Sequence, residues 1–248
     1  MERIIYLDDT TSTNDYLLKN ADLYRNEEMV IAVADYQSNG HGMGMNTWES
    51  EKGANLLFSI LVHPQWMEAG VQFLASMAEA VAIREVLAQY ADGFTIKWPN
   101  DIYWNDRKIS GTRIDCNIQG REMTDMVIGT GININQEVFV SDAPNPVSLS
   151  QITGRKHDCR KILDQIIKRF VYYYGVAKDE WESYDCDTIM REYHKYLYRK
   201  GEFHFYEDDN GAFEGRILDA HPNGILNIER RNGNISQYEY KEVKFIIP

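Results

Sequence analysis

The sequence is poor in the residue patterns that form disulfide frameworks or metal sites. Its 248 residues include three cysteines, which are odd in number and far apart, at positions Cys116, Cys159 and Cys186. No Cys-x-x-Cys pair occurs, and the six histidines form no His-x-His or His-x-x-x-His group. These absences exclude a disulfide scaffold and a zinc site built from Cys or His. They predict free thiols in a reducing compartment.

Long hydrophobic runs are also lacking. The N-terminus, MERIIYLDDT, carries charges from its second residue and has no apolar segment of the signal-peptide type. No apolar run approaches the roughly 20 residues that a membrane-spanning helix needs. We therefore expect a cytoplasmic protein without a membrane partner.

Positive charge is scarce. The chain has 26 Lys and Arg residues against 38 Asp and Glu residues, and its net charge is -12. Proteins that bind nucleic acid neutralise phosphates with clustered Lys and Arg, so we expect no nucleic-acid partner. A local basic patch around a small anionic ligand remains compatible with this charge.

The periodicity of apolar residues predicts a mixed α/β main domain. Expected strands cover Arg3–Leu7, Met29–Tyr36, Ala54–His63 and the stretches FTIKW, KISGTRIDCNI and MTDMVIGTGINI, with a hairpin at Gln119–Gly120. Helical spacing marks Val71–Tyr90, Cys159–Asp179 and Ile189–Leu197, and a short capped helix is expected after Thr11. Strands and helices do not alternate regularly, which argues against a doubly wound parallel sheet.

The character of the sequence changes after about residue 198. From Lys200 onward it contains only short strands separated by turn signals such as DDNG, HPNG and RNGN. This pattern predicts a main domain over residues 1–198 and a small β-barrel of SH3 type over residues 199–248. The fold class expected is thus α+β, a mixed sheet flanked by helices with a C-terminal β-barrel.

Four polar or glycine-rich clusters lie at predicted strand ends, where ligand-binding loops commonly occur. They are Thr11–Asp15, Gln37–Trp48, Lys97–Gly111 and Gly129–Asn135. Each has a structural alternative: a helix cap, a flexible hairpin, a β-hairpin with a polar tip, and a glycine-bearing strand. The last cluster lacks the third glycine and the following helix of a dinucleotide fingerprint.

Spacing gives no Ser–His–Asp or Cys–His set. Glycines, lysines and Asn/Asp residues without a nucleophile predict positioning and charge stabilisation, as in nucleotidyl or phosphoryl transfer. Successive backbone N–H groups freed by the glycines of residues 40–44 could form a concave anion site.

Taken in this order, the clusters resemble the biotin protein ligases. The matching segments are Thr11–Asn14 (TSTN), Gly40–Trp48, Gly53–Ser59 (GANLLFS), Lys97–Asp101 (KWPND), Lys108–Gly111 (KISG) and Gly129–Asn133 (GTGIN). The likeness covers nearly the whole chain, and KWPND with KISG at this separation is its most specific part. It implies a class II synthetase-like catalytic domain followed by the SH3-like barrel.

The resemblance implies a two-step reaction. Biotin and ATP give biotinyl-5′-AMP and pyrophosphate, and a lysine of a biotin carboxyl carrier domain then takes the biotinyl group. ATP with Mg²⁺ and biotin are the expected small molecules, the carrier domain of a biotin-dependent carboxylase is the expected partner, and the expected assembly is a monomer or homodimer. Neither step needs an enzyme nucleophile.

The resemblance also implies roles for individual residues. Biotin-binding residues are expected at Ser12, Thr13, Asn14, Gln37, Gly40, His41, Trp48, Lys108, Gly111, Gly129 and Gly131. Nucleotide-binding residues are expected at Met43, Asn55, Lys97, Asn100 and Asn133. Lys108, Lys97 and Asp101 are the expected catalytic residues, and Asp101 is the expected metal ligand.

The chain departs from the family in two respects. The family loop carries arginines where this sequence has His41 and Met43. We expect backbone N–H groups and Lys108 to hold the adenylate in place of these arginines. Release of biotinyl-5′-AMP should then be faster, which an off-rate measurement can test. Alternatively, Arg113 or another cation supplies the missing positive charge. The first strand begins near Arg3, which leaves no room for a helix-turn-helix domain, so we expect the monofunctional form.

Two other functions stay open. A lipoate or octanoate ligase or transferase has a related fold and a lysine-bearing strand, although the polar TSTN and KWPND segments favour biotin. A non-catalytic biotin or adenylate sensor would keep the cleft and release no pyrophosphate.

Overall fold

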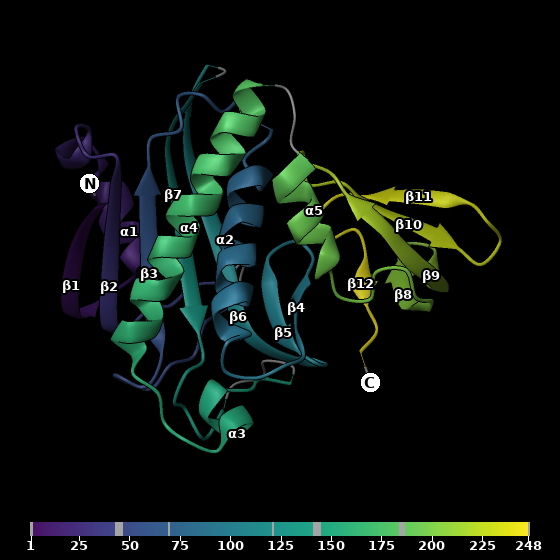
Figure 1. Ribbon diagram of the computed structural model, residues 1–248, viewed down its shortest axis with the longest axis horizontal. Coiled ribbons are helices and arrows are strands. Elements are labelled where there is room, and N and C mark those ends of the chain that lie inside the picture. Colours follow the sequence, from purple (N-terminus) through teal and green to yellow (C-terminus); the bar gives the residue numbers. More distant parts are fainter. Residues whose placement is uncertain are drawn as a thin grey trace.

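The computed structural model describes residues 2–42, 47–68, 70–120, 122–140, 145–183 and 187–247, and it contains a large mixed sheet and a smaller antiparallel one (Figure 1). The large sheet has the strand order β1-β2-β3-β7-β6-β5-β4. Its strands are β1 (Glu2–Thr10), β2 (Met29–Gln37), β3 (Leu56–Val62), β4 (Phe94–Lys97), β5 (Asp101–Trp104), β6 (Arg107–Gln119) and β7 (Glu122–Ile132). Only the β1–β2 pair is parallel among these neighbours. The α+β prediction is confirmed.

Burial along the strands follows their position in the sheet. β3 is buried over its whole length because helices cover both of its faces, whereas the edge strand β1 is largely exposed. β6 and β7 are joined by the predicted hairpin, in which Gly120 takes a positive φ of 67°. A positive φ is easily adopted by glycine, so the Gln-Gly turn signal was sufficient to find this connection.

Helices α2 (Phe73–Leu87) and α4 (Cys159–Glu182) cover one face of the sheet, and α5 (Asp187–Lys195) lies beside α2 (Figure 1). α2 is buried on nearly all sides because it lies between the sheet and α4. α4 buries one apolar stripe, which includes Ile162, Ile166 and Phe170. No helix in the described ranges has the length and apolar character needed to cross a membrane.

The opposite face of the sheet is only partly covered. Helix α1 (Thr13–Lys19) and the 3₁₀ helix η1 (Ala21–Tyr24) pack there with Leu17 and Ala21 against Leu61 and Val127. Side chains alternate between the two faces of a strand, so the residues that follow Val127 on its face of β7 are Gly129 and Gly131. This uncovered part of the sheet becomes the floor of the cleft described below.

The short helix α3 (Leu149–Thr153) was not predicted. Five residues are too few to show helical periodicity. A capping box marks the helix start: the Gln151 backbone N–H donates to the Ser148 hydroxyl at 3.3 Å, and the Ser148 N–H donates to the Gln151 side chain at 3.0 Å. The Ser-x-x-Gln spacing was the signal that could have found it.

The C-terminal segment forms a five-stranded antiparallel sheet in the order β11-β10-β9-β8-β12. Its strands are β8 (His204–Asp208), β9 (Gly211–Ala220), β10 (Leu226–Arg230), β11 (Ile235–Tyr238) and β12 (Lys244–Phe245). This sheet is consistent with the expected SH3-like module, while the boundary at residues 198 and 199 stays a prediction. Buried Tyr193, Tyr206 and Phe245 belong to one hydrophobic cluster that joins α5 to the module.

Candidate functional site

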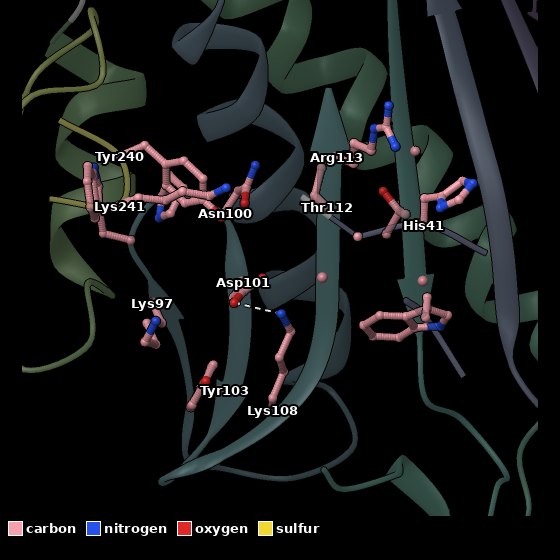
Figure 2. Close-up of a pocket in the computed structure, with 18 of the residues that line it drawn as sticks. His41, Lys97, Asn100, Asp101, Tyr103, Lys108, Thr112, Arg113, Tyr240 and Lys241 are labelled. Carbon is pink, nitrogen blue, oxygen red and sulfur yellow. Dashed lines mark ion pairs between the residues drawn. The ribbon is translucent and has the colours of Figure 1, made fainter. Parts of the chain in front are cut away.

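A cleft of about 780 Å³ opens on the glycine-bearing face of the large sheet. It is bounded by the start of α1, the loop that begins after β2, the β4–β5 hairpin, strands β6 and β7, and the segment around β12 (Figure 2). All four clusters noted in the sequence contribute to its lining. The predicted residues that line it are Ser12, Thr13, Asn14, Gln37, His41, Trp48, Lys97, Asn100, Asp101, Lys108, Gly111, Gly129 and Gly131.

The start of α1 serves both as a helix cap and as a wall of the cleft. Ser12 is the N-cap, and its hydroxyl accepts from the backbone N–H of Asp15 at 3.4 Å. The Thr13 backbone N–H and hydroxyl both donate to Gln37 Oε1, at 2.7 and 3.0 Å. The helix cap that TSTN could form is therefore present, Gln37 lines the cleft beside it, and the ligand-binding role of these residues stays a prediction.

A continuous set of hydrogen bonds crosses the floor from Thr13 to Arg113. The Thr13 and Ser59 hydroxyls lie 2.6 Å apart, and Ser59 donates to Asn14 Oδ1 at 2.5 Å. Asn14 Nδ2 donates to Asp115 Oδ2 at 2.8 Å, and Arg113 donates to Asp115 Oδ1. Because Asn14 is buried and both ends of its amide are bonded, this end of the cleft is held in one arrangement.

Glycines on β6 and β7 make room for side chains on the floor. A Cβ added at Gly129 would lie 1.8 Å from Asn14 Oδ1, and one at Gly131 would lie 2.3 Å from the Trp48 ring. Trp48 also lies 3.0 Å from the Cβ position of Gly111. Gly129 is therefore required by the close approach of Asn14, and Gly111 and Gly131 by that of Trp48.

The other end of the cleft carries cations. Lys108 Nζ pairs with Asp101 Oδ2 at 2.8 Å (Figure 2), and both side chains remain partly exposed. Lys97 Nζ lies 4.5 Å from the centre of the Phe245 ring, and burial lowers the pKa of this lysine. Such cations suit a phosphate-bearing ligand, because a ligand anion could replace or join the Asp101 carboxylate beside Lys108.

The KWPND segment forms the turn of the β4–β5 hairpin, as its structural alternative predicted. The turn is anchored from three sides: Asn100 donates to the Ser76 hydroxyl at 2.9 Å, Tyr193 donates to the Pro99 carbonyl at 2.8 Å, and Trp98 donates to the Gly224 carbonyl at 3.2 Å. A hairpin tip held by α2, α5 and the C-terminal module places Lys97 and Asp101 rigidly at the cleft.

Three of the predicted site residues that the structure describes are not among those that line the cleft. Asn55 is buried and its amide is bonded to Gln136, Ser50 and the backbone of Ile134, so it connects the end of the loop to the segment after β7. Asn133 is buried. Gly40 closes the base of the loop through Trp48 N–H to its carbonyl at 2.9 Å, and Met43 lies outside the described residues. Their ligand-binding roles stay predictions.

Several lining residues were missed by sequence reasoning. They include Tyr103, Asp106, Thr112, Tyr240, Lys241 and Phe245. Tyr240 and Lys241 were read only as part of a predicted strand, and no local pattern links that stretch to a site more than 100 residues earlier. Arg113, named from the sequence only as an alternative cation, lines the cleft, and alternation along the strand places it on the same face as Gly111.

Behind the floor, Glu79 is fully buried on α2 and receives a hydrogen bond from the Thr130 hydroxyl of β7. Burial raises the pKa of Glu79 to about 7, and hydrogen bonds from Thr130 and Thr112 oppose this rise only in part. The carboxyl group therefore lies directly beneath the strands that carry the glycine floor.

Stability should decrease with rising pH because of Glu79. As pH rises, the Glu79 carboxyl group loses its proton near pH 4.5 in the unfolded chain and only near pH 7 in the folded protein. The contribution of the protonated Glu79 to the free energy of unfolding is therefore full below about pH 4.5 and lost by about pH 7. The loss is on the order of 3 kcal/mol. Urea unfolding between pH 5 and 8 should show this slope in the wild type and not in Glu79→Gln. The control Glu27→Gln, at a partly exposed carboxylate that pairs with Arg3, should keep the wild-type slope. Equal slopes for wild type and Glu79→Gln would contradict the assignment.

Three comparisons place this arrangement among known proteins. The profile of the biotin/lipoate A/B protein ligase family matches residues 6–133. The bifunctional ligase/repressor BirA of Bacillus spizizenii is 28% identical over 94% of this chain, and the biotin–protein ligase of Homo sapiens is 26% identical over 94%. The chain spans 71% of the first relative and 33% of the second. A solved structure of a biotin protein ligase from Aquifex aeolicus in complex with biotin and ATP has a TM-score of 0.78, with 22% identity and 99% of each chain covered.

Proposed function

Because the chain belongs to the biotin/lipoate A/B protein ligase family, we propose that it is an ATP-dependent biotin–protein ligase acting on a lysine of a biotin carboxyl carrier domain. The observation that carries the proposal is the polarity of one cleft. A fixed hydrogen-bonding network around Thr13 and Asn14 lies at one end, and the Lys108–Asp101 pair lies at the other. A substrate with a polar head and a carboxylate tail fits both ends.

The polar end suits the ureido head of biotin. Once buried, a ureido group needs both donors and acceptors, or its desolvation is uncompensated. The Gln37 amide and the Ser12 and Thr13 hydroxyls supply such groups and are already oriented by bonds to one another and to α1. An acyl chain without polar atoms would offer these groups no hydrogen-bond partner.

The first step joins the acid to the nucleotide. A biotin carboxylate oxygen forms a bond to the α-phosphorus of ATP, the bond to pyrophosphate breaks, and negative charge accumulates on the phosphate oxygens. Lys108 and Lys97 would stabilise this charge, and Asp101 would hold the Lys108 ammonium in position until the substrate arrives. Trp48 over the glycine floor would exclude water from the adenylate.

The second step transfers the acyl group. The amine of the carrier lysine attacks the carbonyl carbon of biotinyl-5′-AMP, AMP leaves, and the amine loses a proton. The side of the cleft lined by Tyr240 and Lys241 would receive the carrier lysine. No enzyme nucleophile takes part, in agreement with the absence of a Ser–His–Asp or Cys–His set in the sequence.

Magnesium would accompany ATP. The described residues contain no group of three or more His, Cys, Asp or Glu side chains that could hold a metal ion. Mg²⁺ commonly takes one or two carboxylates together with substrate phosphates. Asp101 fits the role of that carboxylate, and the bound ion would neutralise charge on the phosphates.

Incubation of the protein with ATP, Mg²⁺, radiolabelled biotin and a purified biotin carboxyl carrier domain tests the proposal. We expect label on the carrier lysine and one pyrophosphate per label, with lipoate and octanoate labelling far less. A carrier whose acceptor lysine is replaced by arginine is the control. Labelling by lipoate in place of biotin, or biotin binding without pyrophosphate release, would overturn the assignment.

A further inference from the structure

Arg113 lies on the floor of the cleft, beside the glycines. Gly111, Arg113 and Asp115 are spaced by two residues along β6, so their side chains emerge on the same face. In the pairing with β7, Gly111 is opposite Gly131 and Arg113 is opposite Gly129. Figure 2 shows Arg113 and His41 on the β6–β7 side of the cleft, with Tyr240 and Lys241 on the other side.

The Arg113 guanidinium is held in a defined orientation. Its Nε and Nη2 atoms donate to Asp115 Oδ1 at 3.1 and 2.8 Å, and the other oxygen of Asp115 accepts from Asn14. Within the described ranges, Nη1 has no hydrogen-bond partner, and the side chain is 32% exposed. A guanidinium fixed along one edge presents its remaining donors in a known direction.

Arg113 is also the permanent positive charge at this end of the site. Residues 37–48 contain no lysine or arginine. Among the described lining residues, the other permanent cations are Lys97, Lys108, Lys241 and Lys244, which belong to the hairpin, the start of β6 and the C-terminal module. The end that contains Thr13 and Asn14 therefore has a single fixed cation, and it is linked to both residues through Asp115.

We propose that Arg113 is a specificity-determining residue, whose Nη1 donates to an acceptor oxygen in the head group of the acid substrate. The identity of that acid, biotin with its ureido oxygen, rests on the proposed function. An acceptor oxygen gains a charge-assisted hydrogen bond here. An apolar acyl chain would instead remove water from the guanidinium without replacing its hydrogen bonds. Arg113 thus selects ureido acids over fatty acids.

Calorimetric titration of Arg113→Leu with biotin, desthiobiotin and octanoate tests this selection. Desthiobiotin keeps the ureido group of biotin and lacks the sulfur. Both acids should therefore bind Arg113→Leu about 10-fold or more weakly than they bind the wild type. Octanoate should bind Arg113→Leu better than it binds the wild type. The Kd for ATP should not change. Arg113→Lys keeps the positive charge and lacks the paired guanidinium donors, so its affinity for biotin should lie between those of the wild type and Arg113→Leu.

Arg191→Leu, on the exposed side of α5, is the matched control and should bind biotin as the wild type does. Asp115→Asn should weaken biotin binding less than Arg113→Leu, because it loosens the guanidinium and keeps its charge; thermal unfolding checks that each variant is folded. Unchanged biotin affinity in Arg113→Leu, or an equal loss of biotin and ATP affinity, would overturn the proposal. Failure of the proposed function is separate, since it shows in the wild type as absent biotin-dependent pyrophosphate release.

Discussion

Replacing Lys108 with alanine should reduce the rate of adenylate formation by about 100- to 1000-fold, the effect typical of losing one oriented group that stabilises transition-state charge. Lys108 Nζ is held 2.8 Å from Asp101 and lies 3.1 Å from the Cβ position of Gly111, over the floor of the cleft. Negative charge develops on phosphate oxygens only as the carboxylate attacks, so the loss should appear mainly in kcat and less in the KM for biotin.

The same substitution should have little effect on folding. The Lys108 and Asp101 side chains are 27% and 20% exposed, so water screens the pair, and its loss should lower the free energy of unfolding by about 1 kcal/mol or less. Single-turnover pyrophosphate release and urea unfolding, measured on the same preparation, separate the two effects.

Asp101→Asn and Lys178→Ala are the matched controls for Lys108→Ala. Asp101→Asn breaks the same ion pair and keeps the lysine, so its rate should fall less than that of Lys108→Ala. Lys178 pairs with Glu182 on α4, away from the cleft, and Lys178→Ala should release pyrophosphate at the wild-type rate. A near wild-type rate for Lys108→Ala would show that Lys108 is not the main electrostatic catalyst.

Local patterns in the sequence were sufficient for most of the fold. The strands and long helices follow apolar periodicity, and the β6–β7 hairpin follows its Gln-Gly turn. The four clusters that line the cleft were visible because each combines glycine or Asn/Asp with a predicted strand end. Features of this kind are set by neighbours in the chain, so the sequence alone exposes them.

Features that depend on packing between distant segments could not be predicted. Asn14 meets Asp115 across 101 positions of the chain, and only the sheet register brings Arg113 beside Gly129. The Asn55 amide is bonded to Ser50, Gln136 and the backbone of Ile134, which no local pattern reveals. Residue type therefore indicates what a side chain can bind, and tertiary contacts decide whether it is available.

Gly129→Ala should produce the second large effect, a loss of about 2–4 kcal/mol in the free energy of unfolding together with a large loss of biotin affinity. The added methyl group would lie 1.8 Å from Asn14 Oδ1. Asn14 cannot turn aside without breaking its bonds to Ser59 and Asp115, so the clash would disrupt the whole network at the polar end of the cleft. The backbone of Gly129 needs no positive φ, so the effect of the methyl group is steric.

A double-mutant cycle with Asn14→Ala distinguishes this clash from a general intolerance of β7 to substitution. Asn14→Ala alone should lose biotin affinity, and adding Gly129→Ala to it should cost little further stability, because the side chain that the methyl group meets is gone. Gly175→Ala, where the added Cβ contacts nothing within 4 Å, should be neutral or stabilising. If Gly129→Ala destabilises the Asn14→Ala variant as much as the wild type, contact between Asn14 and the strand is not what requires glycine at this position.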